Sequence, residues 1–544
     1  MAWTPSVVVC ATLALLLVGV LPTSAQQRPE PQRIPATKPI EAARTTAAAE
    51  PMAVVAPAPT SVSVPQFSGP LPATSASYPF NAADHNANPL DLASYGYIEQ
   101  EFLVNGTANV YGWQGSTLSV GVVGSGPYVT RILVRKPTSQ ARFSGSVVVE
   151  ALNPSYGFDL DYIWAAGHDY FLFHDAAARG DAWVGVTVHP NSIETLKRFD
   201  PVRYGPLSMA NPTGQSCATL APEYSPASEQ GLEWDMLSQV GALLKSNQAS
   251  SPLSGLAVQF AYAAGYSRGA NDLVTYANAF GKQVSLASGK PIFDGYLLGA
   301  AVGGPTTLSQ CATWYPPGDP HAMIQPNRVP IVRVNTQSDF GWWFGAPGSG
   351  VSAASTLNRR PDRDMVGDQF RLYEFPGASH LWLFPEHFFP NSAELGRIGA
   401  GTVGYTCAEQ PGSDFPLHYF LRGAYANLDR WARTGAPPVR GDRIALNNPG
   451  SYAETTVTDQ WGNARGGVRS PYLDVPRATY VPYSGGAGCG AWGHKNLFAP
   501  SFLTGMYPGA SYLNQVTAST LRLLAGTWFT EADARAIIDA AAHT

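Results

Sequence analysis

The sequence predicts an α/β fold in which helices cover both faces of a mostly parallel β-sheet. Apolar runs of strand length, such as residues 146–152 (SVVVEAL) and 183–188 (WVGVTV), alternate along the chain with segments of helical periodicity. The first of these runs is continuously apolar and β-branched, as expected of a strand buried on both faces. Strand and helix in repetition favour parallel strands joined by helical crossovers.

Seven strands are expected in chain order. Residues 128–135 alternate in polarity and predict an early, half-exposed strand. The others are expected at residues 146–152, 183–188, 260–264, 291–298, 329–334 and 370–375. Helices are expected at residues 229–244, 270–280 and 417–434, followed by Gly/Pro-rich coil around 435–490. A final helix is expected after Thr530 as N-cap, with Asp533 as its first-turn carboxylate.

Two stretches interrupt this repeat. Residues 190–228 are too long and irregular for an ordinary connection, and residues 340–368 contain FGWWFG followed by an Arg/Asp-rich loop. Long insertions of this kind usually form lids or pocket walls. We expect residues 66–544 to form a single domain that carries both insertions and a C-terminal extension.

The N-terminus is expected to direct export. An apolar run at residues 7–20 precedes LPTSA, so residues 1–25 have the form of a signal peptide, although no Lys or Arg precedes the run. An uncleaved anchor is the alternative, but the run is short for a membrane span. Residues 26–65 are rich in Pro and Ala without an aromatic residue, which predicts a disordered linker. The mature protein is therefore expected to be secreted or periplasmic, with no membrane span.

Composition excludes two other classes. The 544 residues include 34 Lys and Arg and 39 Asp and Glu, which gives a net charge of 34 − 39 = −5 without a basic block. Nucleic-acid binding is not expected from such a chain. The 13 Trp, 25 Tyr and 23 Phe residues exclude a largely disordered one.

Five cysteines occur in the chain. Cys10 lies in the signal segment, and the remaining four are Cys217, Cys311, Cys407 and Cys489. An even number in an exported chain favours two disulfides, with three possible connectivities. No pair has the close spacing of a zinc site, so we expect structural roles for all four.

The strongest chemical signal is Gly265-Tyr266-Ser267-Arg268-Gly269, a G-x-S-x-G sequence between a predicted strand and a predicted helix. A nucleophile at this position needs small flanking residues, because the strand and the helix pass close to one another around a strained turn. A tight glycine turn with a bystander serine is the alternative. The strand–turn–helix context favours Ser267 as a nucleophile.

A serine nucleophile needs a base and a group that orients the base. Asp339 lies five residues beyond the strand expected to end at residue 334, and His380 lies five beyond the strand expected to end at residue 375. Both therefore fall on loops at the carboxyl ends of strands, in the chain order Ser, Asp, His. This order is typical of α/β-hydrolase triads.

Other residues compete for the two partner roles. His387 is the nearest alternative base, and Asp362 and Asp364 are alternative acids in the loop between the same two strands. Each lies farther from its strand end than His380 or Asp339. Three upstream histidines are expected to be structural: His168, His174 and His189.

The remaining parts of the site are assigned by position. One oxyanion-hole donor is expected to be the backbone N–H of Arg268, and the second that of Ser155 or Tyr156, in the loop after residues 146–152. Trp342 and Trp343 follow Asp339 and are expected either to line an apolar substrate pocket or to pack within a lid.

With these residues placed, the chain resembles a secreted bacterial group of the α/β-hydrolase superfamily, the large alpha/beta hydrolase domain proteins of esterase-like type. The resemblance rests on VVVEALNPS, AAGYSRGAND, FDGYLL, RLYEFPGASHLW, PLHYFLRGAYANLDRWARTGAPP and GGVRSPYLDVP, and extends from about residue 90 to the C-terminus. It implies an α/β-hydrolase fold with Ser267, Asp339 and His380 as nucleophile, acid and base. It implies no particular substrate.

These observations together predict a serine hydrolase that cleaves small carboxylic esters of neutral, apolar or aromatic character. An amidase or peptidase with the same triad is one alternative, and a non-catalytic binding protein on a hydrolase scaffold is another. We expect the reaction to need no metal or organic cofactor.

Overall fold

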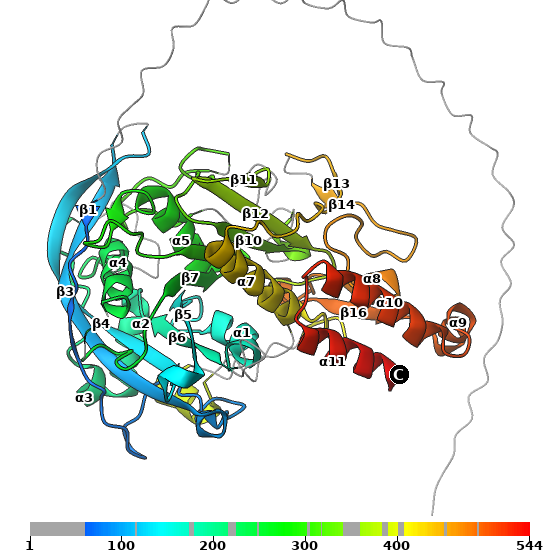
Figure 1. Ribbon diagram of the computed structural model, residues 1–544, viewed down its shortest axis with the longest axis horizontal. Coiled ribbons are helices and arrows are strands. Elements are labelled where there is room, and N and C mark those ends of the chain that lie inside the picture. Colours follow the sequence, from blue (N-terminus) through cyan, green and yellow to red (C-terminus); the bar gives the residue numbers. More distant parts are fainter. Residues whose placement is uncertain are drawn as a thin grey trace, which may run out of the picture. The chain divides into compact units, whose positions relative to one another are not determined.

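A ten-stranded mixed sheet organises the chain (Figure 1). In spatial order its strands are β11 (Arg363–Met365), β12 (Asp368–Phe375), β10 (Ile331–Thr336), β9 (Gly295–Gly299), β7 (Phe260–Tyr266), β5 (Phe143–Ala151), β6 (Gly180–Val186), β4 (Val120–Pro137), β3 (Tyr97–Trp113) and β2 (Gln66–Ser68). The six neighbours from β12 to β6 are parallel, and the pairs at both edges are antiparallel. The expectation of a mostly parallel sheet is confirmed.

The structure is a computed structural model, and it describes most of a unit that spans residues 57–544. The described residues are 60–114, 117–172, 179–215, 225–246, 248, 250–301, 305–316, 318–340, 359–382, 390–400, 407–450, 454–486 and 489–543. Within these ranges, no helix is both long and apolar enough to cross a membrane.

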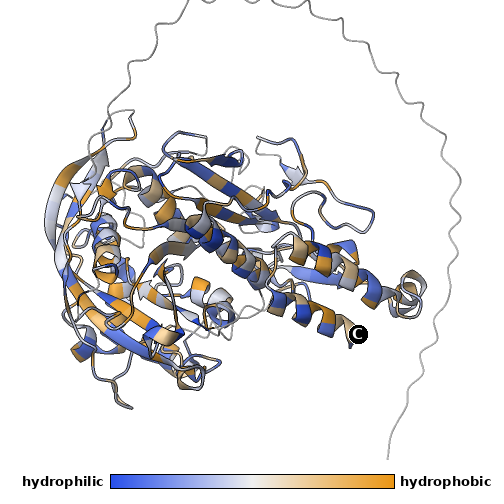
Figure 2. Ribbon diagram, viewed as in Figure 1, coloured by the Kyte–Doolittle hydropathy of each residue, from blue (hydrophilic) through white to orange (hydrophobic). Residues whose placement is uncertain are grey.

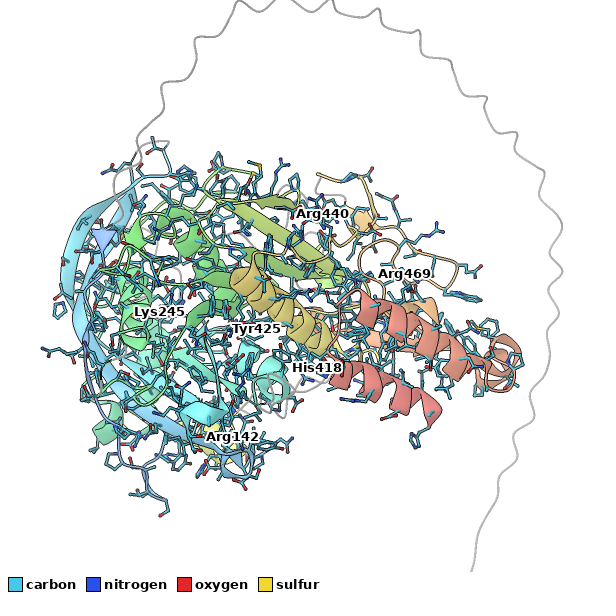
Figure 3. All side chains as sticks on the ribbon, viewed as in Figure 1. Arg142, Lys245, His418, Tyr425, Arg440 and Arg469 are labelled. Atoms are coloured by element: carbon cyan, nitrogen blue, oxygen red, sulfur yellow. A yellow bond between two sulfur atoms is a disulfide. The ribbon has the colours of Figure 1, made fainter. Side chains whose placement is uncertain are left out.

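Helices cover both faces of the parallel strands. On one face lie α1 (Tyr162–Leu172) and α7 (Leu417–Thr434), which contact one another and the central strands. On the other lies α5 (Arg268–Ala279). Neighbouring residues of β9 show this division, because Gly295 lies against Leu428 of α7 whereas the ring of Tyr296 lies 6.3 Å from that of Tyr276 on α5. Tyr425, labelled in Figure 3, lies on α7. Its hydroxyl donates to Asp181 Oδ2 of β6 at 2.7 Å.

Most predicted elements are present. Each expected strand overlaps an observed one, the expected helix at residues 417–434 coincides with α7, and the helix expected at 229–244 contains α4 (Glu233–Leu244). The last helix is α11 (Glu531–Ala542), where the Thr530 hydroxyl accepts the backbone N–H of Asp533 at 3.1 Å. Figure 2 shows hydrophobic and hydrophilic residues interleaved along α10 (Ser511–Ala525) and α11.

The expectation of a half-exposed strand at residues 128–135 is wrong. This segment lies within β4 and is almost entirely buried, because its polar members are buried in ion pairs. Arg131 pairs with Glu101 at 2.7 Å and Arg135 with Asp161 at 2.7 Å, so these charges face partners inside the protein. The alternation in polarity therefore reflects an internal ion-pair network and not a solvent-facing side.

Three further expectations need correction. The stretch at residues 190–228 begins with two helices, α2 (Pro190–Phe199) and α3 (Pro201–Tyr204), each started by a proline in its first turn. The expected linker ends before residue 65, because β1 (Thr60–Ser61) pairs with β8 (Val284–Ser285). The coil around 435–490 contains short elements: β13 (Leu446–Asn447), β14 (Thr455–Thr456), α8 (Pro471–Asp474) and β15 (Ala478–Val481).

Several elements were not predicted. They include the long strand β3, which forms a hairpin with β4, the edge strands β2 and β11, and four elements after residue 390: α6 (Ser392–Arg397), β16 (His494–Leu497), α9 (Pro500–Met506) and α10. One disulfide joins Cys407 and Cys489. Cys311 is also disulfide-bonded, and Cys217 lies outside the described residues.

Candidate active site

Ser267 occupies a strained turn between β7 and α5. Its backbone has φ 53° and ψ −116°, a conformation that costs free energy for a non-glycine residue and that recurs at functional sites. Glycines on both sides make the turn possible. A Cβ added to Gly265 would lie 2.6 Å from the Gly269 carbonyl group, and one added to Gly269 would lie 2.3 Å from the Ala151 carbonyl oxygen.

The structure brings the three predicted triad residues together. His380 Nε2 lies 2.9 Å from Ser267 Oγ, and His380 Nδ1 lies 3.0 Å from Asp339 Oδ1. Asp339 follows β10 and His380 follows β12, so both side chains reach the nucleophile from the carboxyl ends of neighbouring parallel strands. Exposed fractions of 9% for Ser267, 5% for His380 and 6% for Asp339 leave the chain of contacts largely shielded from water.

The carboxylate of Asp339 is held from its own loop. The Thr336 backbone N–H donates to Asp339 Oδ2 at 2.7 Å, which leaves Oδ1 for the histidine. The loops that carry the acid and the base are also joined to one another, because the Gln337 backbone N–H donates to the Ala378 carbonyl oxygen at 3.0 Å. These bonds fix the orientation of the acid relative to the base.

Tyr266, directly before the nucleophile, supports the base. Its hydroxyl donates to the His380 carbonyl oxygen at 2.6 Å, and its ring lies 5.6 Å from the imidazole. Burial and the neighbouring Asp339 carboxylate raise the pKa of the Tyr266 phenol well above its ordinary range. The phenol is therefore protonated near neutral pH, as a hydrogen-bond donor must be.

The expected oxyanion-hole donors lie on two segments, α5 and the loop after β5. Arg268 is the first residue of α5, so its backbone N–H lies at the positive end of the helix, next to the nucleophile. In the facing loop, the Ser155 backbone N–H donates to Asn153 Oδ1 at 2.8 Å and is already engaged. Tyr156, the other candidate on this loop, stays a prediction as the second donor.

Positioning residues outside the triad were not singled out from the sequence. Asn153 Nδ2 donates to the Tyr266 carbonyl oxygen at 2.8 Å, which ties the oxyanion loop to the residue before the nucleophile. Asn153 and Tyr266 act through hydrogen bonds between distant segments, whereas the Thr336 N–H bonds to Asp339 within one loop. Their only sequence signal is their place at or beside the end of a predicted strand.

The rival acids have other partners. Asp362 accepts the Leu372 backbone N–H at 3.0 Å and pairs with Arg443 at 2.8 Å. Asp364 pairs with Arg371 at 2.5 Å and with Arg440. Four of the residues discussed from the sequence lie outside the described residues: His174, His387, Trp342 and Trp343.

Within the described residues, a second group of titratable side chains lies close together. His189, Glu233 and Asp272 bring three potential metal-ligand atoms within 4.8 Å of one another. The sequence predicts a structural role for His189, and its imidazole pairs with Asp272 at 3.2 Å.

Comparisons with known proteins agree with this fold. The family described as "Alpha/beta hydrolase domain" matches residues 67–539. The chain belongs to this family. No curated protein matches it in sequence.

Among solved structures, a lipase/esterase from Lactobacillus plantarum is 13% identical over 46% of this chain and 84% of its own, with a TM-score of 0.23. An α/β serine hydrolase without a lid from Xanthomonas campestris is 11% identical over 50% and 85%, with a TM-score of 0.23. A glucuronoyl esterase from Solibacter usitatus is 8% identical over 51% and 77%, with a TM-score of 0.25. Such TM-scores carry no argument about function.

Proposed function

We propose that this protein is a serine hydrolase that cleaves carboxylic esters through an acyl-enzyme on Ser267. The observation that carries the proposal is the continuous contact from Ser267 Oγ to His380 Nε2 and from His380 Nδ1 to Asp339 Oδ1. A serine hydroxyl is a weak nucleophile until an adjacent base removes its proton. These contacts supply that base and a carboxylate to orient it.

In the first half-reaction, Ser267 Oγ attacks the ester carbonyl carbon while His380 Nε2 takes the hydroxyl proton. The Asp339 carboxylate stabilises the imidazolium that forms. Negative charge develops on the carbonyl oxygen, where the backbone N–H groups of Arg268 and Tyr156 stabilise it. His380 then gives its proton to the leaving alkoxide, the C–O bond breaks, and an acyl-enzyme remains.

In the second half-reaction, water replaces the alcohol. His380 takes a proton from the water as its oxygen attacks the acyl carbon, and a second tetrahedral intermediate forms. His380 returns the proton to Ser267 Oγ as the acyl–oxygen bond breaks. The products are a carboxylic acid and the regenerated serine.

The test is hydrolysis of a panel of p-nitrophenyl esters, lactones and anilides by the wild type and by Ser267→Ala. We expect the variant to lose at least about 10³-fold in kcat/KM, since removal of a nucleophile leaves only the residual catalysis of the binding site. Ser519→Ala is a matched control, because Ser519 is equally buried, at 9% exposed, but lies on α10. Unchanged turnover in Ser267→Ala would overturn the proposal.

The same panel separates the alternatives. Faster hydrolysis of anilides than of matched esters would assign an amidase. Absence of turnover together with saturable binding of a panel member would assign a binding protein on a hydrolase scaffold.

We also propose a neutral, apolar or aromatic ester as the substrate, on the ground that only 13% of the residues are charged. Acyl chains matched in length, with and without a terminal carboxylate, test this preference. A higher kcat/KM for the charged esters would contradict it.

We propose further that the chain is exported. The apolar run at residues 7–20 and the Cys407–Cys489 disulfide support this, because disulfides persist in oxidising compartments. N-terminal sequencing of protein recovered outside the cytoplasm should begin near residue 26. An intact Met1 in a cytoplasmic fraction would contradict the proposal.

A further inference from the structure

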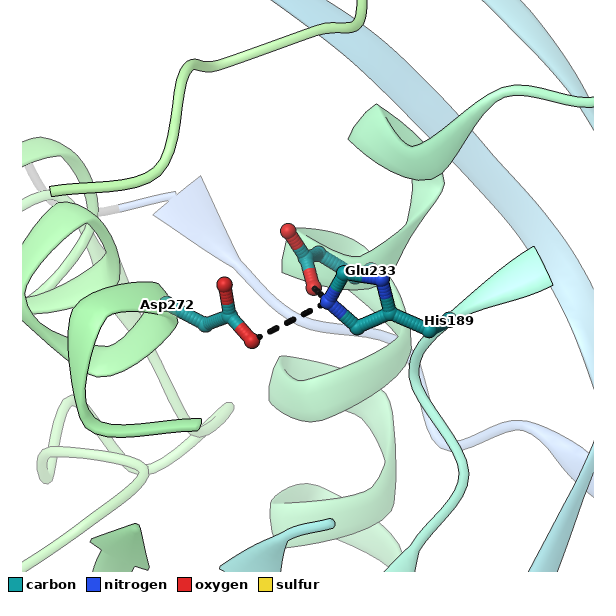
Figure 4. A group of neighbouring side chains, drawn as sticks. All are labelled: His189, Glu233 and Asp272. Atoms are coloured by element: carbon teal, nitrogen blue, oxygen red, sulfur yellow. Dashed lines mark hydrogen bonds and ion pairs between the residues drawn. The ribbon is translucent and has the colours of Figure 1, made fainter. Parts of the chain in front are cut away.

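Outside the triad, three side chains that can bind a metal converge from three separate elements (Figure 4). His189 directly precedes α2, Glu233 is the first residue of α4, and Asp272 lies on α5, five residues after the nucleophile. All three are buried, with exposed fractions of 3%, 0% and 0%. Buried charges in proteins are paired or bind a metal, and of these two carboxylates that of Asp272 forms an ion pair with Arg268 at 3.3 Å.

The atoms that face the centre of this group have suitable spacing for a metal ion. His189 Nε2 lies 3.2 Å from Asp272 Oδ2 and 3.9 Å from Glu233 Oε2. Ligand atoms at about 2.0–2.2 Å from a shared tetrahedral zinc ion are separated by about 3.4 Å. The observed separations therefore allow the three atoms to bind one ion after small side-chain movements.

Glu233 supplies an independent observation. Its Oε2 is buried and has no hydrogen-bond partner, although burial of an unsatisfied carboxylate oxygen is costly. The Oε1 of the same carboxylate accepts a hydrogen bond from Gln230 Nε2 at 2.9 Å. The unsatisfied oxygen is the one that lies toward His189 (Figure 4).

Asp272 is held in the same manner. Its Oδ1 accepts hydrogen bonds from Arg268 Nε at 3.3 Å and from the Thr306 hydroxyl, while Oδ2 lies toward His189. Each carboxylate thus uses one oxygen for protein contacts and presents the other to the centre. Outer hydrogen bonds of this kind orient metal ligands in proteins.

The donor set selects the ion. Calcium and magnesium prefer oxygen ligands alone, whereas zinc readily binds one imidazole nitrogen with carboxylate oxygens. We propose that His189, Glu233 and Asp272 form a structural Zn²⁺ site that joins the segment before α2 to α4 and α5 beside the nucleophile. Three protein ligands leave a fourth position of the tetrahedron, which a water molecule fills in the proposed site. Zinc binding then stabilises the folded state, in which alone the three ligands meet.

The test uses the full folded chain, dialysed against EDTA until metal-free and then titrated with ZnCl₂. We expect one equivalent of zinc by mass spectrometry of the metal content and a rise in Tm of about 2–8 °C at saturation. Equal concentrations of CaCl₂ or MgCl₂ should leave Tm unchanged. Absence of stoichiometric zinc, or a Tm that rises with calcium and not with zinc, would overturn the proposal.

Variants locate the bound ion. Glu233→Gln keeps an oxygen to accept from Gln230 but removes the carboxylate charge, so zinc affinity should fall at least about 10-fold. His380→Ala and Ser267→Ala should bind zinc as the wild type does, which separates this site from the triad and its outcome from that of the proposed function. Loss of zinc in His380→Ala, or unchanged affinity in Glu233→Gln, contradicts the assignment.

A measurement on the wild type covers the case in which Glu233→Gln does not fold. Addition of one equivalent of Co²⁺ to the metal-free protein should give the intense visible absorption of a tetrahedral ion, and one equivalent of Zn²⁺ should abolish it. A spectrum that stays as weak as that of octahedral aqueous cobalt would overturn the proposal.

Discussion

Replacement of Asp339 by asparagine tests how the acid acts on the base. The substitution keeps the size of the side chain and removes its charge. In the structure, Asp339 Oδ2 accepts the Thr336 backbone N–H at 2.7 Å and Oδ1 lies 3.0 Å from His380 Nδ1. An asparagine has one oxygen for these two positions, so one of them must face an NH₂ group.

The Thr336 backbone N–H determines which of the two hydrogen bonds the asparagine oxygen keeps. Its N–H is fully buried, so the amide oxygen is expected to stay with it and the NH₂ group to face His380. The imidazole must then accept at Nδ1 and carry its proton on Nε2, where it cannot remove the proton of Ser267. The active tautomer requires the reverse orientation, which sets the NH₂ group against the Thr336 N–H.

The magnitude follows from these two effects. Leaving the buried Thr336 N–H unsatisfied costs about 1–3 kcal/mol, and loss of the charge-assisted bond to the imidazolium costs about 1.5–3 kcal/mol. Together they amount to about 2.5–6 kcal/mol, or about a 10²- to 10⁴-fold decrease in kcat/KM. Stability should change much less than activity.

The assay is steady-state hydrolysis of the best ester from the panel, with thermal unfolding as a check on folding. Asp362→Asn and Asp364→Asn serve as controls, because these rival acids pair with arginines away from His380. We expect both controls to stay within about tenfold of the wild type. A loss below tenfold in Asp339→Asn, or a larger loss in either control, would refute the assignment of the acid.

Three further predictions concern stability. Gly269→Ala places a Cβ 2.3 Å from a carbonyl oxygen of β5, so it should lower the free energy of unfolding by about 1–3 kcal/mol and impair turnover. Gly396→Ala is the control and should be neutral, because Gly396 has open space around it. Equal effects of the two substitutions on Tm would contradict this prediction. Burial raises the pKa of the Glu394 carboxyl to about 8, so the folded state holds this proton more tightly than the unfolded state, and stability falls as pH rises from about 4 to about 8. In the Glu394→Gln variant, Tm should fall less between pH 5 and 8 than it does in the wild type. The same dependence of Tm on pH in both proteins would count against this prediction. Cys407→Ser opens a disulfide between residues 82 positions apart and should cost about 4 kcal/mol in urea unfolding, and a loss under about 1 kcal/mol would refute a stabilising role for the bond to Cys489.

The parallel core and the triad could be predicted because their signals are local. Ser267 lies in a five-residue sequence whose glycines are required by the close approach of β5, β7 and α5. Asp339 and His380 each follow a buried strand, and the carboxyl ends of parallel strands meet at one edge of a sheet. The positions of the three residues along the chain were therefore enough to predict that their side chains meet.

The features that were predicted wrongly or not at all depend on contacts between distant segments of the chain. The alternation at residues 128–135 predicts a solvent-facing side, but Arg131 and Arg135 pair with acids on other segments of the chain. Such partners lie 26–30 positions away from their arginines and leave no periodic signal. The same holds for Asn153 and for the group around His189, whose members are brought together only by the folded sheet and helices.

Covalent labelling shows whether Ser267 is an activated nucleophile. The wild type, Ser267→Ala and heat-denatured wild type are each treated with a fluorophosphonate, which reacts with activated serines, and their peptides are analysed by mass spectrometry. We expect one phosphonyl adduct, on Ser267, in the folded wild type and none in the other two samples. A folded wild type that stays unlabelled, or that carries its adduct on another residue, would contradict it.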